Sequence, residues 1–292
     1  MSYDLDLFFK PPVRRRRVLK HFAARKHFTI DGDDVAYQHP DTGVGFFTRL
    51  RCARNVLLQR TVVAAEFEIN YSRPSFFGLE AEKELSAFVA TFQPQIDDPQ
   101  MRGMGEGPYS GRGFLGGWNF GNIFSVGNRL IDDPHREILL LPAAQLRDAW
   151  AWNYECAERR EKYSRSAFVP FIWFLVVDGR VRRAALWPEG RPILLPKVDL
   201  VVVGWVVEGE KQFGVAAWPE AEDVARRAGF DVAKDPIDIR YLIKPKPIAD
   251  WVAQIASVAR IQYVEPHRVF DDELIAAARE SIEKDRVPYN DI

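Results

Sequence analysis

Cysteine is scarce in this chain, which has Cys52 and Cys156 and no others. Neither lies in a CxxC pair, so the sequence offers no zinc ribbon and no thioredoxin-like motif. Two cysteines in 292 residues are more typical of free thiols in a reducing compartment than of a disulfide-stabilised secreted protein. We therefore expect both side chains to be reduced and buried.

Long hydrophobic runs are also missing. The longest apolar run, Phe168–Val177, is much shorter than the roughly 20 residues that a membrane-spanning helix needs. The N-terminal segment MSYDLDLFFKPPVRRRR places its apolar residues before its basic run and alternates them with aspartate, which is not the order of a signal peptide. We expect a cytoplasmic protein with no membrane partner.

Motifs of the familiar enzyme classes are absent as well. The chain has no GxSxG and no HExxH, and its 5 histidines are scattered. The segment Gly111–Gly116 matches GxGxxG, but its lead-in, GEGPYS, is not a strand, and a dinucleotide site requires one. A nuclease motif is approached by Asp199 with Glu208–Lys211, but the spacing is E-G-E-K rather than E-x-K. We expect no enzymatic activity, no catalytic residue, no metal and no cofactor.

Charge of one sign does not dominate. The net charge of −1 gives no overall attraction to nucleic acid, and we expect no nucleic-acid partner. The distribution is uneven, since residues 1–60 hold 12 Lys/Arg against 6 Asp/Glu, whereas residues 61–106 hold 3 against 8. The basic run Arg14–Arg17 could contact phosphate, but no aromatic residues that would stack on bases are interleaved with it. A solvated helix face is the favoured interpretation.

The first hundred residues show both hydrophobic periods. Alternation over Tyr3–Leu7 and Glu66–Tyr71 predicts half-buried strands, and the turn 39–43 between two apolar runs predicts a hairpin. Helical spacing places Leu85, Phe88, Val89 and Phe92 on one face of a helix, with Glu80, Glu82 and Glu84 expected on its outer face.

The second half continues this mixture. A helix is expected over 143–162, followed by a buried strand over 168–177 and a two-residue turn at Asp178-Gly179. Further strands are expected at 180–187, 198–207, 212–218 and 237–243, and further helices between Pro219 and Gly229, over 248–259 and after Asp271 or Asp272. The fold class is therefore α+β, with two mixed or antiparallel sheets and packed helices.

The chain is long enough for two lobes, and we place them at residues 1–165 and 166–292. The first lobe contains a glycine-rich stretch, residues 101–128, which we expect to be a loop because so many glycines disfavour regular structure. Two interpretations of this loop stay open. It either packs between the lobes or is exposed for recognition.

Four stretches of the first lobe resemble a bacterial family whose members are similar to the immunity proteins of polymorphic toxins and type VI secretion effectors. They are YDLDLFF, HPDTGVGFF, FEINYSRPSFFGLEAEKELSAF and DPQMRGMGEGPYSGRGFLGGWNFGN, and the resemblance extends over residues 3–175. It implies a catalytically silent, cytoplasmic α+β scaffold that occludes the active site of a toxin.

The sequence therefore predicts a non-enzymatic protein that binds and neutralises a cognate toxin or effector, for example a nuclease with a basic cleft. An acidic rim that would steer and plug such a cleft is expected from Asp97, Asp98, Glu106, Asp132 and Asp133. Met104, Tyr109 and Trp118 are expected to form its apolar centre, since Met and aromatic residues are enriched in interfaces.

Two alternatives remain at this point. The first is an enzyme whose active site is the glycine-rich loop, with Glu106, Tyr109, Arg112 and Asn119 lining a pocket. The second is an oligomeric structural subunit that associates through a sheet edge. The oligomeric state is left open by the sequence.

Overall fold

The computed structural model describes residues 1–54, 58–135, 137–258 and 261–286 and has the expected α+β architecture. Contacts divide the chain into two compact units, Met1–Ile138 with Phe270–Ile292, and Leu139–Val269. The expected lobes divided the chain at residue 165 instead. The units differ from them because the last helix packs with the first unit, and because the helix after residue 142 belongs to the second.

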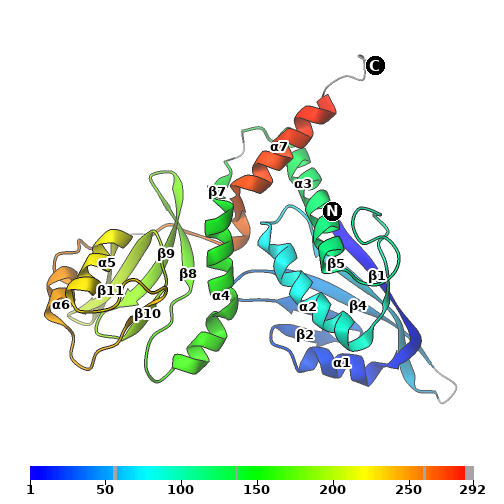
Figure 1. Ribbon diagram of the computed structural model, residues 1–292, viewed down its shortest axis with the longest axis horizontal. Helices are drawn as coiled ribbons and strands as arrows, with labels where there is room; N and C mark the ends of the chain where they lie inside the picture. The colour runs from blue at the N-terminus through cyan, green and yellow to red at the C-terminus, as the bar shows by residue number, and fades with distance from the viewer. Residues whose placement is uncertain (55–57, 136, 259–260, 287–292) are drawn as a thin grey trace. The chain divides into compact units, whose positions relative to one another are not determined.

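Unit 1 is built on an antiparallel six-stranded sheet in the order β2-β3-β4-β5-β1-β6 (Figure 1). Its strands are β1 (Ser2–Arg14), β2 (Phe28–Asp31), β3 (Asp34–Gln38), β4 (Gly45–Arg54), β5 (Arg60–Asn70) and β6 (Gln95–Asp97). The strict alternation in β1 buries Tyr3, Leu5 and Leu7, each with 1% exposure or less. The strands predicted over Tyr3–Leu7 and Glu66–Tyr71 are confirmed, since they lie in β1 and β5, which pair with each other. The predicted hairpin is also confirmed and is formed by β3 and β4.

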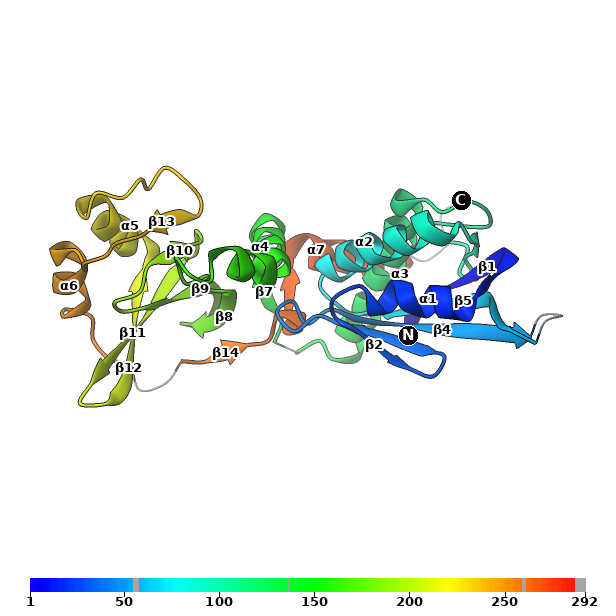
Figure 2. The ribbon, with the colours of Figure 1, turned by 90° about the horizontal axis from the view of Figure 1, so that it is seen from below.

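Helices cover the buried face of this sheet (Figure 2). They are α1 (Arg15–Ala23), α2 (Phe76–Phe92) and α3 (Gly111–Asp132). The last helix, α7 (Asp272–Arg286), comes from the far end of the chain and packs on α3. Phe22 of α1 stacks on Phe88 of α2, with ring centroids 5.1 Å apart. The predicted cap of the last helix is confirmed, because Oδ1 of Asp271 accepts a hydrogen bond from the Leu274 N–H at 2.9 Å.

The predicted outer face of α2 is wrong for two of its three glutamates. Glu80 is 0% exposed and accepts hydrogen bonds from the Tyr37 hydroxyl at 2.9 Å and the Thr42 hydroxyl at 3.0 Å. Glu84 is 8% exposed and pairs with Arg25 at 2.6 Å. Both carboxylates therefore point into unit 1, where these hydroxyl and guanidinium groups provide the partners that a buried carboxylate needs. Sequence periodicity carried no sign of those distant donors.

Unit 2 contains a mixed five-stranded sheet in the order β12-β11-β9-β8-β14. Its strands are β8 (Ile172–Val177), β9 (Arg180–Pro188), β11 (Leu200–Val207), β12 (Glu210–Ala217) and β14 (Tyr263–Val264). Only β9 and β11 pair in parallel among these described strands. The predicted turn between β8 and β9 is confirmed, since Asp178 and Gly179 have φ values of 50° and 71°.

The remaining elements of unit 2 are shorter. A two-stranded sheet joins β10 (Ile193–Leu195) to β13 (Ile237–Ile239). The helices are α4 (Ala143–Tyr163), α5 (Trp218–Arg227), α6 (Lys246–Val252) and the 3-10 turn η1 (Pro266–Arg268), and β7 (Leu139–Leu141) and β15 (Val269–Asp271) lie where the chain passes from one unit to the other.

Three predicted elements of this half were too long. The strand expected over 168–177 begins only at Ile172. The strand expected over 237–243 ends at Ile239, because β10 offers only three partner residues to β13. The helix expected over 248–259 ends at Val252, and residue 259 lies outside the described part of the chain. Both cysteines are free, but Cys52 is half-buried whereas Cys156 is buried. Within the described residues, no helix has the length and hydropathy needed to cross a bilayer.

Candidate partner-binding surface

The glycine-rich stretch is not the loop that the sequence predicted. From Gly111 onward it forms α3, a helix of 22 residues, and the side chain of Ser110 caps it by accepting the Gly113 N–H at 3.2 Å. Each helical glycine costs about 1 kcal/mol relative to alanine, so local propensity favours a loop. Tertiary packing overrides that preference, because the glycines let α3 lie against bulky rings of the sheet.

This close approach is clearest at two glycines. A Cβ atom at Gly117 would overlap the hydroxyl of Tyr3, and one at Gly121 would overlap the ring of Tyr71. The rings of Tyr3 and Tyr71 themselves stack with centroids 6.4 Å apart. The glycines of α3 therefore serve to seat the helix on the ends of β1 and β5.

Three faces of α3 have different environments. Phe114, Trp118 and Asn122 are fully buried on the face toward the sheet and α2. Val126 belongs to a hydrophobic cluster with Leu274, Ile275 and Ala278 of α7, so a second face packs on the last helix. The third face is open to solvent.

A row of large apolar side chains follows that open face. Phe120, Phe124 and Ile131 are 49%, 48% and 46% exposed, and their spacing of four and seven residues keeps them on one side of the helix. The guanidinium of Arg102 lies over the Phe120 ring, 4.7 Å from its centroid. We call Phe120, Phe124 and Ile131 the α3 stripe.

The sequence interpretation placed the apolar centre at Met104, Tyr109 and Trp118 and did not identify the α3 stripe. Once the segment is taken as a helix, the spacing of these residues becomes a signal. Under the expectation of a loop it had no meaning, because side chains in a loop share no regular face.

The eight predicted contact residues do not form one surface. Asp98 and Trp118 are both 0% exposed, so a partner cannot touch either without rearrangement of the unit. Asp97, Met104 and Tyr109 are half-buried. Glu106, Asp132 and Asp133 are exposed.

The expected acidic rim is also divided in space. Asp97 and Asp98 lie beside the segment that leads into α3, as shown by the hydrogen bond of the Asp98 N–H to Gly105 at 3.2 Å. Asp132 ends α3 and Asp133 follows it, whereas the Tyr3 hydroxyl that Asp98 binds lies against Gly117. About 22 Å of helix therefore separates the two acidic pairs. Only the second acidic pair adjoins the α3 stripe, directly after Ile131.

Asp98 has an internal role instead. Its carboxylate accepts hydrogen bonds from the Tyr3 hydroxyl at 2.9 Å, the Gln100 N–H at 3.0 Å and the Met104 N–H at 3.1 Å. Burial, and then the neighbouring Asp98, raises the pKa of Tyr3 far above its usual value. The carboxylate thus fixes the chain between β6 and α3 to the first strand.

The residues proposed for an enzyme pocket are likewise dispersed. The Tyr109 hydroxyl is directed at Oε1 of Glu82, 3.4 Å away, rather than at Glu106, and burial raises the pKa of Tyr109. Arg112 and Asn119 are exposed on α3. Among the residues that the structure describes, no group of three or more His, Cys, Asp or Glu side chains is placed to hold a metal ion.

Comparisons of the chain with protein-family models, with curated proteins and with solved structures give no match.

Proposed function

We propose that the protein is a cytoplasmic, non-enzymatic immunity protein that binds a cognate bacterial toxin and occludes its active site. The α3 stripe is the observation that carries this proposal. Phe120, Phe124 and Ile131 expose apolar side chains on a helix held by the sheet and by α7. Aromatic side chains on a rigid element are the residue types that anchor protein interfaces.

Charge indicates the kind of partner. Asp132 and Asp133 follow the stripe, are exposed, and make no ion pair with any described residue. Carboxylates without internal partners retain their full attraction for an approaching basic surface. A toxin with an apolar pocket beside a basic cleft, such as a nuclease, would match both parts.

The test uses a toxin encoded beside the gene of this protein, coexpressed with it in a sensitive host. Wild-type protein should restore growth and bind the purified toxin. Phe124→Ser should weaken that binding at least tenfold, since it removes a central aromatic anchor, which is worth about 2 kcal/mol or more. Asp132→Lys with Asp133→Lys should mainly slow association.

Phe47→Ser is the matched control, because Phe47 is 54% exposed but lies on β4 rather than on α3. Equal loss of binding in both serine variants would contradict the assignment of the surface. Failure of the wild-type protein to protect would contradict the function itself. If the mass of the purified protein in solution rises with its concentration, and if Phe124→Ser lowers that mass, the α3 stripe would instead join two copies of this chain.

A further inference from the structure

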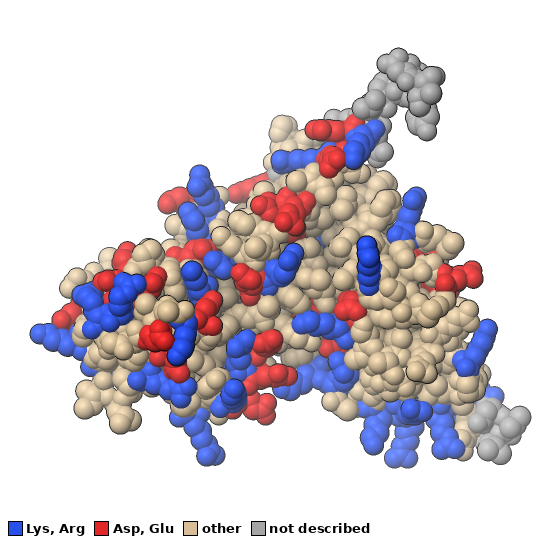
Figure 3. Space-filling model, in the orientation of Figure 1, with Lys and Arg blue, Asp and Glu red and all other residues tan. Residues whose placement is uncertain are grey.

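A hollow of about 650 Å³ opens on unit 1 beside α1, and its lining is strongly basic. Arg14, Arg15, Arg16, Lys20 and Arg60 line it, and no Asp or Glu is among its lining residues. We call it the basic hollow. In Figure 3, Lys and Arg side chains gather along the edge of unit 1 on which α1 lies.

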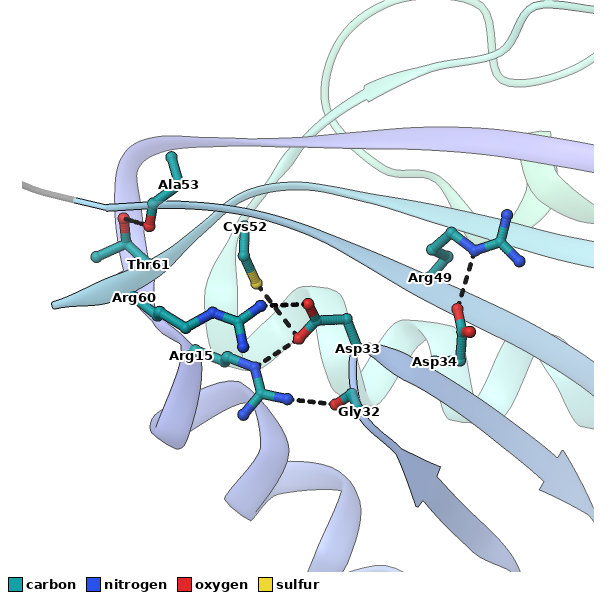
Figure 4. A network of polar contacts seen from close by, with 9 residues as sticks. All are labelled: Arg15, Gly32, Asp33, Asp34, Arg49, Cys52, Ala53, Arg60 and Thr61. Carbon is teal, nitrogen blue, oxygen red and sulfur yellow. Dashed lines mark hydrogen bonds and ion pairs between the residues drawn. The ribbon is translucent and has the colours of Figure 1, made fainter.

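Elements distant in the sequence bring these cations together. Arg14 ends β1, Arg15 begins α1, and Arg60 begins β5. Figure 4 shows Arg15 and Arg60 converging on one carboxylate, that of Asp33, which they contact at 2.5 Å each. Asp33 therefore holds two guanidinium groups at the side of the hollow and is itself occupied by them.

The other cations of the hollow have no such partner. Within the described residues, Arg14, Arg16 and Lys20 make no ion pair, and all three side chains are exposed. Like charges this close repel one another at low ionic strength. A bound anion would relieve the repulsion.

The location of these arginines at the N-terminus of α1 adds to the repulsion between the cations. The first turn of α1 contains no acidic residue and has no side-chain cap, and it begins with arginines. Helix N-termini carry a partial positive charge and favour carboxylates, so cations there are unfavourable. The same N-terminus suits phosphate, because the first N–H groups of a helix have no intrahelical partner.

We propose that the basic hollow binds the phosphodiester backbone of a nucleic acid without recognising its sequence. Guanidinium groups match phosphate geometry in a bidentate manner, and four of the five cations are arginine. The lining has no aromatic ring on which a base could stack, which favours backbone contacts alone. A concave surface fits a rod-like backbone better than it fits a flat anionic bilayer.

This inference replaces the expectation of no nucleic-acid partner, which rested on the net charge of −1. Net charge cancels over the whole chain, whereas binding depends on the local field. The proposal is independent of the α3 stripe and of a toxin.

The test is the binding of the full chain to a fluorescein-labelled DNA duplex of mixed sequence, followed by anisotropy. With the three unpaired cations, Arg14, Arg16 and Lys20, engaged, the plot of log K against log salt should have a slope of about −2.7. Affinity should accordingly fall about 40-fold between about 50 mM and about 200 mM salt. A duplex of a second sequence should bind equally well.

Arg14→Gln with Arg16→Gln should change the slope to about −0.9, since two of the three phosphate contacts are lost. Arg226→Gln with Arg227→Gln is the matched control, because it removes the same charge from exposed residues of α5 in unit 2. Lys20→Gln provides a second, single variant if the double variant fails to fold. It should lower the magnitude of the slope by about 0.9.

Three results would overturn the proposal. The first is an absence of duplex binding at the lower salt concentration. The second is an equal loss of affinity in the α5 control, which would indicate a general charge effect. The third is binding to phosphatidylserine vesicles but not to the duplex, which would assign the hollow to a membrane surface.

Discussion

The phenol of Tyr3 donates a hydrogen bond to Oδ2 of Asp98 across 95 positions of sequence, and both side chains are fully buried. The contact joins the first strand to the segment that leads into α3. It places a tyrosine where one more atom on Gly117 would cause a clash. The seat of the candidate binding helix therefore depends on a polar pair inside unit 1.

Tyr3→Phe should destabilise the protein by about 1–3 kcal/mol, because Asp98 loses one of its donors while it stays buried. Urea unfolding followed by circular dichroism measures this loss. Tyr71→Phe is the control, since the Tyr71 hydroxyl makes no hydrogen bond to the described residues. An effect of Tyr3→Phe no larger than that of Tyr71→Phe would show that the buried pair contributes little.

Two glycines of α3 should respond in opposite directions to alanine. At Gly116 nothing lies within 4 Å of an added Cβ, so Gly116→Ala should stabilise the helix by about 0.5–1 kcal/mol. At Gly121 the added atom meets the ring of Tyr71, so Gly121→Ala should destabilise by about 1–3 kcal/mol. Thermal unfolding of both variants decides the matter, and shifts of the same sign would argue against the seating of α3.

Much of unit 1 is visible in the sequence because its signals are local. Tyr3, Leu5 and Leu7 alternate with aspartates, and this period of two is enough to define a half-buried strand. In unit 2, the turn at Asp178-Gly179 is equally local. These predictions are confirmed by the structure.

The candidate surfaces are not visible in the same way. The helical state of α3 depends on the rings of Tyr3 in β1 and of Tyr71, which directly follows β5, and the glycines of α3 do not encode those rings. The burial of Glu80 depends on Tyr37 and Thr42, about 40 residues away. The basic hollow combines Arg14 with Arg60 only after β1 and β5 have paired. Such long-range relationships leave no period in a single sequence.

Acid should weaken the packing of α1 through His21. Its ring lies among Phe22, Phe88 and Phe92, with centroid distances of 5.3–5.6 Å. Burial, and then the charge of Arg25, lowers the pKa of His21 below its usual 6.5. The stability that the neutral ring provides is therefore complete above pH 6.5 and is lost as pH falls from there through the folded-state pKa.

His21→Gln should flatten that part of the stability profile, measured by urea unfolding between about pH 8 and about pH 5. His135→Gln serves as the control, because the side chain of His135 is exposed. A profile that keeps its slope in His21→Gln and loses it in His135→Gln would place the titrating group elsewhere.

In unit 2, Asn153 should be required for the attachment of α4 to β8. Its side chain is 2% exposed and pairs with the backbone of Ile172 in both directions, donating at 2.9 Å and accepting at 2.7 Å. Asn153→Ala should cost about 3 kcal/mol, since it leaves a buried N–H and a buried carbonyl without partners. Unfolding of unit 2, monitored by tryptophan fluorescence, reports the change.

Asn153→Asp separates the two hydrogen bonds. A carboxylate still accepts from the Ile172 N–H but cannot donate to the Ile172 carbonyl, which it instead repels. This variant should therefore be at least as unstable as Asn153→Ala at neutral pH and should recover in acid, as the carboxyl becomes protonated and regains a donor. Asp148→Ala, on the exposed side of the same helix, should change stability by no more than about 0.5 kcal/mol. Wild-type stability in Asn153→Ala would mean that packing alone holds β8 against α4.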